Sequence, residues 1–116
     1  MSLNQALQWN GTAQALEATE DVTVQAAPAA GKRIYIQKGT LTVHLAATGG
    51  GGKVALEDGA GGARIVELDA DAERELAIDF GTPGYPITAA TLLNITVDGA
   101  ETNQASASVA LTGIII

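Results

Sequence analysis

The sequence predicts an all-β protein: an antiparallel, jelly-roll-like β-sandwich of about seven or eight strands. Three observations lead to this fold class. Apolar and polar residues alternate over short segments, which is typical of strands with one buried face. Gly, Pro or Asp bounds nearly every such segment. No segment shows a helical period long enough for a parallel crossover, so the sheets should be mostly antiparallel.

Length and composition fit one small domain with an aliphatic core. The chain has 116 residues, of which 47% are hydrophobic and only 3% aromatic, so disorder is excluded and bulk must come from Ala, Val, Leu and Ile. The absence of Cys excludes disulfides, a thiolate nucleophile and Cys-bound zinc. Six Lys and Arg against 13 Asp and Glu give a net charge of -7, which argues against a nucleic-acid partner.

Membrane and secretory segments are not expected. No apolar run approaches the roughly 18 residues of a membrane span. The first residues lack a basic region followed by an apolar stretch, so no secretory signal is visible.

The beginning of the chain differs from the rest. Residues 1–20 follow no sustained period and are predicted to form an N-terminal arm containing a short strand, with an amphipathic helix as the alternative. Residues 21–116 are predicted to form a single β-sandwich domain. Its first strand is expected over residues 21–25, and residues 26–31 should then form a turn.

Residues 32–47 predict one long strand or two joined strands. Ile34 and Ile36 share one face, whereas Leu41, Val43 and Leu45 share the other parity, so a one-residue offset must lie between them. We expect a β-bulge or bend at Lys38 and Gly39.

The remaining strands follow from the same alternation. Residues 53–57 and 63–68 predict a hairpin, and residues 75–80 a further strand followed by a loop over 81–86. Residues 93–97 form the cleanest strand pattern, with residues 105–112 as its expected partner. The alternation places the following residues in the core: Val24, Ile34, Ile36, Val43, Leu56, Ile78, Leu93, Ile95, Val97, Val109 and Leu111.

Catalytic machinery is not expected. His44 is the only histidine, and no Gly-x-Ser-x-Gly motif accompanies it, so an exposed or interfacial strand histidine is the preferred interpretation. The glycines at 49–52 lack the Lys-Ser/Thr of a phosphate-binding loop. We therefore predict no enzymatic activity, no catalytic residues and no cofactor.

Acidic residues are interpreted as solvated rather than metal-binding. Asp69, Asp71 and Glu73 have the alternate spacing that opens a calcium loop, but Arg74 stands where an EF-hand requires Gly. A solvated turn is therefore expected here, with no metal. The pairs Glu57–Asp58 and Glu20–Asp21 are expected to be solvated strand ends.

Four apolar residues are candidates for an interface between subunits. Trp9 lies in the irregular arm, and the chain ends in the apolar run Ile114, Ile115 and Ile116. Packing within the chain itself is the alternative for both features. We predict that they form an interface and that the protein is a homo-oligomer.

The stretch from Val24 to Ile36, with the sequence VQAAPAAGKRIYI, resembles the "AAPxxGKRI" segment of small structural proteins of tailed bacteriophages and prophages. In those proteins it precedes the first long strand of a β-sandwich. The likeness continues more loosely through a Gly-rich middle, the GTPGYPI of residues 81–87 and the LLNITV of residues 92–97, and covers residues 20–113.

The resemblance implies a virion protein of the head or tail, above all a decoration or cement protein on the outer capsid surface. Such a protein is made in the bacterial host cytoplasm, binds the major capsid protein or another virion protein, and often forms a trimer. A tail-fibre or receptor-binding tip module is the alternative within phages. A carbohydrate-binding β-sandwich is the alternative from another class, and it requires Tyr35, Tyr85 and Trp9 to converge into an aromatic platform.

Overall fold

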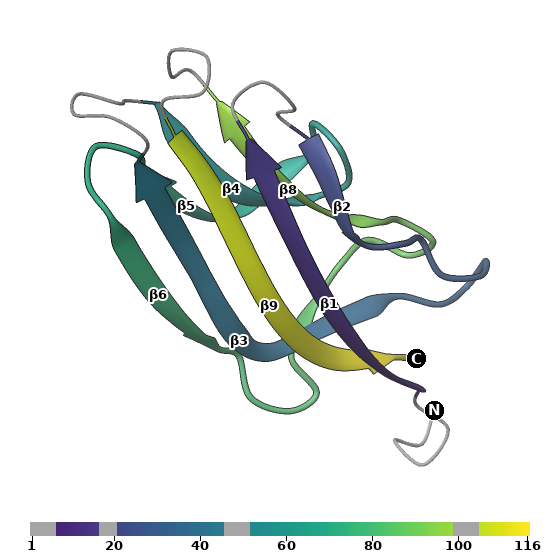
Figure 1. Cartoon of the computed structure of the whole chain (residues 1–116). Coiled ribbons are helices and arrows are strands. Elements are labelled where there is room, and N and C mark those ends of the chain that lie inside the picture. Colours follow the sequence, from purple (N-terminus) through teal and green to yellow (C-terminus); the bar gives the residue numbers. More distant parts are fainter. Residues whose placement is uncertain (1–6, 17–20, 46–51, 99–104) are drawn as a thin grey trace.

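Two antiparallel sheets pack face to face in the computed structural model, which describes residues 7–16, 21–45, 52–98 and 105–116 (Figure 1). The first sheet has the order β1-β9-β3-β6, and the second has the order β2-β8-β4-β5. The bounds of the first sheet are β1 (Leu7–Leu16), β9 (Ala105–Ile115), β3 (Ile34–Leu45), β6 (Arg74–Asp79) and the two-residue β7 (Tyr85–Pro86), which also pairs with β3. Those of the second are β2 (Asp21–Gln25), β8 (Leu93–Asp98), β4 (Lys53–Asp58) and β5 (Ala63–Asp69). The predicted antiparallel β-sandwich is confirmed.

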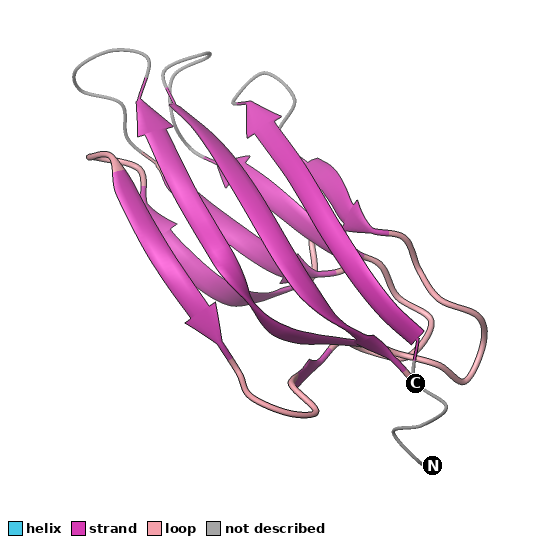
Figure 2. Ribbon diagram, turned by 60° about the horizontal axis from the view of Figure 1, so that its bottom comes forward, coloured by secondary structure: helices cyan, strands magenta, loops and turns pink. Residues whose placement is uncertain are grey.

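The strand order is that of a jelly roll once β7 is set aside. With β7 set aside, the chain stays in one sheet only between β4 and β5 and changes sheet at every other step, including the step from β6 to β8. Only β4 and β5 form the predicted hairpin. Figure 2 shows the strands of both layers in a second view.

One predicted pairing is wrong. β8 and β9 were expected to pair with each other, but β8 lies between β2 and β4, whereas β9 lies between β1 and β3. Both strands alternate cleanly because each is a central strand with one face on the core. Alternation reports burial, and it does not select the partner strand.

The predicted offset in the long strand β3 is confirmed, one residue earlier than expected. Ile36 pairs with Gly113 and Lys38 with Thr112, so Gln37 is the extra residue of a bulge. Ile34 and Ile36 have even residue numbers, whereas Leu41 and Val43 have odd ones, so a regular strand would point the two pairs to opposite faces. Because of the bulge, all four side chains are buried in the same core.

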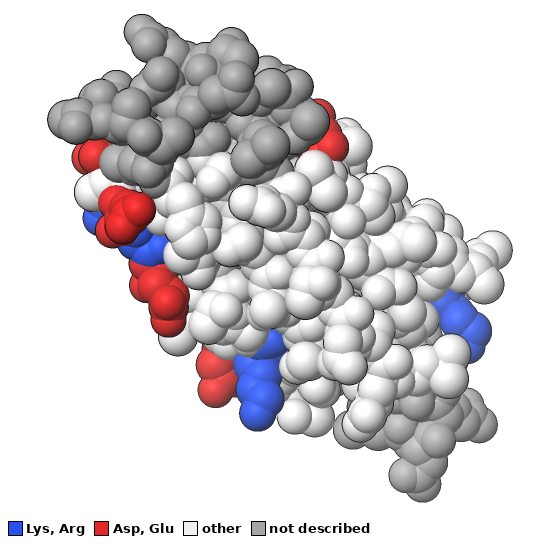
Figure 3. All heavy atoms as spheres, in the orientation of Figure 1, with Lys and Arg blue, Asp and Glu red and all other residues white. Residues whose placement is uncertain are grey.

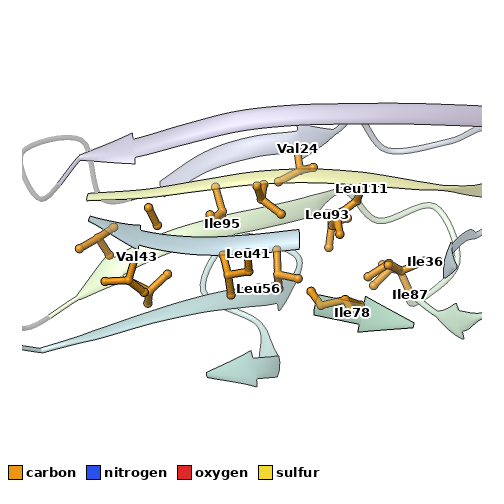
Figure 4. Packing of buried hydrophobic residues seen from close by; sticks show 14 of the residues in the cluster. Val24, Ile36, Leu41, Val43, Leu56, Ile78, Ile87, Leu93, Ile95 and Leu111 are labelled. Atoms are coloured by element: carbon orange, nitrogen blue, oxygen red, sulfur yellow. The ribbon is translucent and has the colours of Figure 1, made fainter. Parts of the chain in front are cut away.

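The core between the sheets is aliphatic, as predicted, and every residue expected there is buried (Figure 4). It also contains residues that the predicted core list leaves out, namely Trp9, Leu41, Val54, Ala70, Ile87 and Ala107. Trp9 is the only aromatic residue in this cluster.

The strand expected in the N-terminal arm is ten residues long and is part of the sandwich itself. β1 pairs with β9 from Leu7↔Ile115 to Leu16↔Ser106. It also packs over β2 of the second sheet. The amphipathic helix weighed for this segment is therefore wrong over residues 7–16, while residues 1–6 and 17–20 lie outside the described part.

No helix capable of crossing a membrane was found among the residues that the structure describes.

Candidate functional site

The outer surface of the first sheet is the most distinctive surface of the molecule. Opposite residues form rows across the strands: Gln14, Ser108, Thr42 and Glu75 make one row, and Thr12, Ala110, Thr40 and Ala77 the next. These side chains point away from the core, because their neighbours along each strand point into it. We call the following residues the hydroxyl face: Asn10, Thr12, Gln14, Thr40, Thr42, Ser108, Ala110 and Thr112.

The hydroxyl face is hollowed along its centre. A shallow depression of about 460 Å³ is lined by residues of β1, β3 and β9, including Thr12, Gln14, Thr40, Thr42 and Ser108. The small Ser108 and Ala110 of the central strand form its floor, while longer side chains of the neighbouring strands form its walls. A second hollow of about 420 Å³ lies beside it and is lined by residues of β3, β6 and β9.

Charge is excluded from the middle of this face. β1 contains no charged residue, and neither does β9. Figure 3 shows the same surface, where acidic and basic side chains lie along the margins of a broad uncharged area. This neutrality is notable in a chain of net charge -7, because neutral surface loses less hydration free energy than charged surface when a partner covers it.

His44 lies at one end of the face and is exposed, as predicted. Its Nε2 atom is 3.2 Å from Ser108 Oγ, and Glu73 and Glu75 line the same hollow. A hydroxyl, an imidazole and carboxylates are thus near one another. An acyl-transfer site also needs two free N–H groups to stabilise an oxyanion. Ser108 belongs to a strand paired on both sides, so the ladder occupies the N–H groups around it.

The acidic residues Asp69, Asp71 and Glu73, predicted to form a solvated turn, are not placed together to hold a metal ion. Asp69 accepts a hydrogen bond from Lys53 Nζ at 2.7 Å, and Asp71 accepts one from Arg74 Nη2 at 2.7 Å. The second bond holds the pKa of Asp71 below its usual range, and the first raises the pKa of Lys53. Within the described ranges, no group of three His, Cys, Asp or Glu side chains is placed to hold a metal ion.

The expectation that Glu57 is a solvated strand end is wrong. Its side chain is 6% exposed, and Oε1 accepts hydrogen bonds from Asn94 Nδ2 at 3.0 Å and from the Gly61 N–H at 3.3 Å. Arg64 Nε lies 3.8 Å from Glu57 Oε2. Asn94 also donates to Asp21 Oδ1 at 3.1 Å, so one buried amide joins strands β2, β4 and β8.

Asp58 and Asp21 are also bonded within the chain. Asp58 accepts hydrogen bonds from the N–H and the hydroxyl of Thr88, the latter at 2.7 Å. The hydrogen bonds of Asp58 therefore connect the end of β4 to the loop that precedes β8. Glu20, the remaining member of these predicted pairs, lies outside the described residues.

Asn94→Leu is expected to lower the free energy of unfolding by about 2 kcal/mol, because it leaves the buried Glu57 carboxylate without its amide donor. Urea denaturation followed by circular dichroism measures this loss. The double variant Asn94→Leu/Glu57→Leu removes both partners and should recover part of the stability. A double variant no more stable than the single one would contradict the role assigned to Asn94.

The four predicted interface residues lie differently from the expectation of an exposed anchor. Trp9 and Ile114 are 5% and 7% exposed in the single chain. Ile115 pairs with Leu7 and Ile34, and Ile116 exchanges backbone hydrogen bonds with Arg33 at 3.0 and 3.2 Å. Most of the surface of these residues is therefore covered by the chain itself, as the alternative interpretation expects.

The indole of Trp9, on β1, forms a hydrogen bond to β3 across the intervening strand β9. Trp9 pairs with Gly113 of β9, and its Nε1–H donates to the carbonyl oxygen of Tyr35 on β3 at 3.2 Å. Trp9 thus cannot join Tyr35 and Tyr85 in a surface platform. The exposed aromatic pair is instead Phe80 and Tyr85, whose ring centroids are 5.3 Å apart.

No protein-family model matches the chain, and no curated protein sequence is similar to it. The fold and the surface described above are therefore the basis for a functional proposal, together with the resemblance of residues 24–36.

Proposed function

We propose that the chain is a non-enzymatic structural protein of a phage virion, of the decoration type, that binds the outer surface of the head. The observation that supports this most is the hydroxyl face: a broad, uncharged sheet surface on a strongly acidic molecule. The resemblance of residues 24–36 to phage structural proteins supplies the biological setting.

The hydroxyl face suits attachment to a protein lattice. Thr, Ser and Ala side chains lose little conformational entropy when covered, and their hydroxyls accept or donate hydrogen bonds to a partner. Acidic side chains elsewhere would stay in water and keep the particle soluble. The proposed partner is the major capsid protein or another virion protein, and the proposed location is the capsid surface.

Cosedimentation with phage heads tests this function. Heads would be assembled from the phage or prophage that encodes the chain, with the gene deleted, and then mixed with purified protein. We expect the chain to sediment with the heads. Ala110→Arg places a charge on the exposed floor of the hydroxyl face and should weaken this binding at least about tenfold, or 1.4 kcal/mol.

Thr23→Arg is the matched control, because Thr23 is exposed on the second sheet and receives the same charge. It should bind like the unmodified chain. The proposal is wrong if the folded chain stays in the supernatant, and the assignment of the face is wrong if both variants bind equally well.

Carbohydrate binding, either as a separate module or in a receptor-binding tip, is the second candidate. The exposed Phe80–Tyr85 pair favours it, since aromatic rings commonly stack against sugars, and a hollow of about 280 Å³ near Phe80 is lined by Gln37, Lys38 and Asp79. Titration with neutral oligosaccharides, observed through Tyr85 and Phe80 ring resonances, tests this candidate. Phe80→Ala should abolish any shifts that are found.

A further inference from the structure

The four edge strands of the sandwich differ in one respect that bears on association. β6 contains Arg74, Glu75 and Asp79; β5 contains Arg64, Glu67 and Asp69; and the short β2 begins at Asp21. Charges on edge strands and short edge strands are the usual means by which proteins prevent edge-to-edge pairing. β1, with the sequence LQWNGTAQAL, is ten residues long and carries no charge.

β1 also has one unpaired side within the part of the chain that the structure describes. It pairs with β9 over its whole length and is the last strand of its sheet. β2 packs beneath it in the other sheet and pairs with β8 instead. One row of β1 backbone N–H and C=O groups therefore faces away from β9 without a strand partner.

We propose that β1 pairs antiparallel with β1 of a second copy of this chain, so that two five-stranded first sheets become one continuous sheet across a twofold axis. In a register centred on Gly11, Gln8 lies opposite Gln14 and Asn10 opposite Thr12. Each of these outward pairs joins uncharged side chains that hydrogen-bond to each other.

The charge distribution favours a second copy at this edge over the other three. Two chains of net charge -7 repel each other, and salt screens that repulsion beyond about 8–10 Å. The charged strands β5 and β6 lie at the opposite side of their sheets from β2 and β1. Joining at β1 therefore keeps these charges far apart and extends the hydroxyl face across both copies. The inference stands independently of the virion function.

The molar mass in solution tests this pairing. Sedimentation equilibrium of the purified chain at about 100 μM should give twice the mass of one chain. This concentration is high enough to populate a dimer whose dissociation constant lies in the micromolar range. Thr12→Lys puts a charge in the middle of the exposed edge strand and should reduce the mass to that of one chain. Thr112→Lys is the matched control, since Thr112 is also exposed on the same face but lies on β9, which is paired on both sides.

Hydrogen exchange gives a second readout that does not depend on any variant. The unpaired row of β1 N–H groups should exchange more slowly as protein concentration rises, while the amides of β5 and β6 should not change. The inference is overturned if the unmodified chain is a monomer at this concentration, or if the two lysine variants have the same mass. A mass of three chains, as the phage resemblance implies, would overturn the twofold pairing and leave the virion function in place.

Discussion

Trp9→Ala is expected to lower the free energy of unfolding by about 3–5 kcal/mol, which is a large part of the stability of a domain of this size. The indole is the largest side chain in the core, and its Nε1–H satisfies the Tyr35 carbonyl. Urea denaturation followed by far-ultraviolet circular dichroism measures the loss.

Trp9→Phe is the matched control, because it keeps a ring in the core and removes the hydrogen bond; it should cost less than half as much. If Trp9 were instead a surface anchor for a neighbouring subunit, Trp9→Ala would leave the stability of the monomer nearly unchanged. That result would contradict the packing of β1 described above.

Gly113→Ala is expected to destabilise the fold by about 3 kcal/mol. A Cβ at Gly113 would overlap the Tyr35 carbonyl oxygen and lie 2.7 Å from Trp9 Nε1. The backbone of β3 cannot move away without breaking the ladder that it forms with β9. The measurement is the same denaturation experiment.

Gly61→Ala serves as the comparison for Gly113→Ala. Gly61 has a φ of +72°, so alanine there is strained, but beyond its own chain neighbours no atom lies within 4 Å of the added Cβ. Its cost should be about 1 kcal/mol, the strain of the left-handed region alone. Equal losses at the two positions would show that close packing around Gly113 contributes nothing.

The sequence was sufficient to predict the fold class and most of the core, because burial on one face of a strand imposes alternation. Ile95 and Val97 illustrate this, since each is flanked by polar residues and fully buried. β1 was underestimated because its inward residues are Trp9, Gly11 and Ala13, whose sizes differ so much that no apolar period is visible. Gly11 is buried because Val24 of the other sheet and the Trp9 ring both lie over it.

The misjudged features depend on partners distant in sequence. The sequence predicts a solvated Glu57 because a carboxylate in isolation prefers water, whereas in the structure its burial rests on Asn94, 37 positions away. The pairing of β8 and β9 was misjudged because neighbours in sequence usually pair, whereas a jelly roll sends them to opposite sheets. The hydroxyl face was not foreseen either, since it forms only when β9 lies between β1 and β3.

The position of β9 also has a consequence for how the chain folds as it leaves the ribosome. β9 follows the other eight strands in the chain, yet it lies in the middle of the first sheet between β1 and β3. At synthesis rates of about 5–20 residues per second, β1 and β3 wait on the order of several seconds for their common partner. Until then β3 can pair with β6 and β7, whereas β1 has no partner strand among the described residues. The uncharged edge of β1 is therefore the part of the nascent chain most open to pairing with a neighbouring chain.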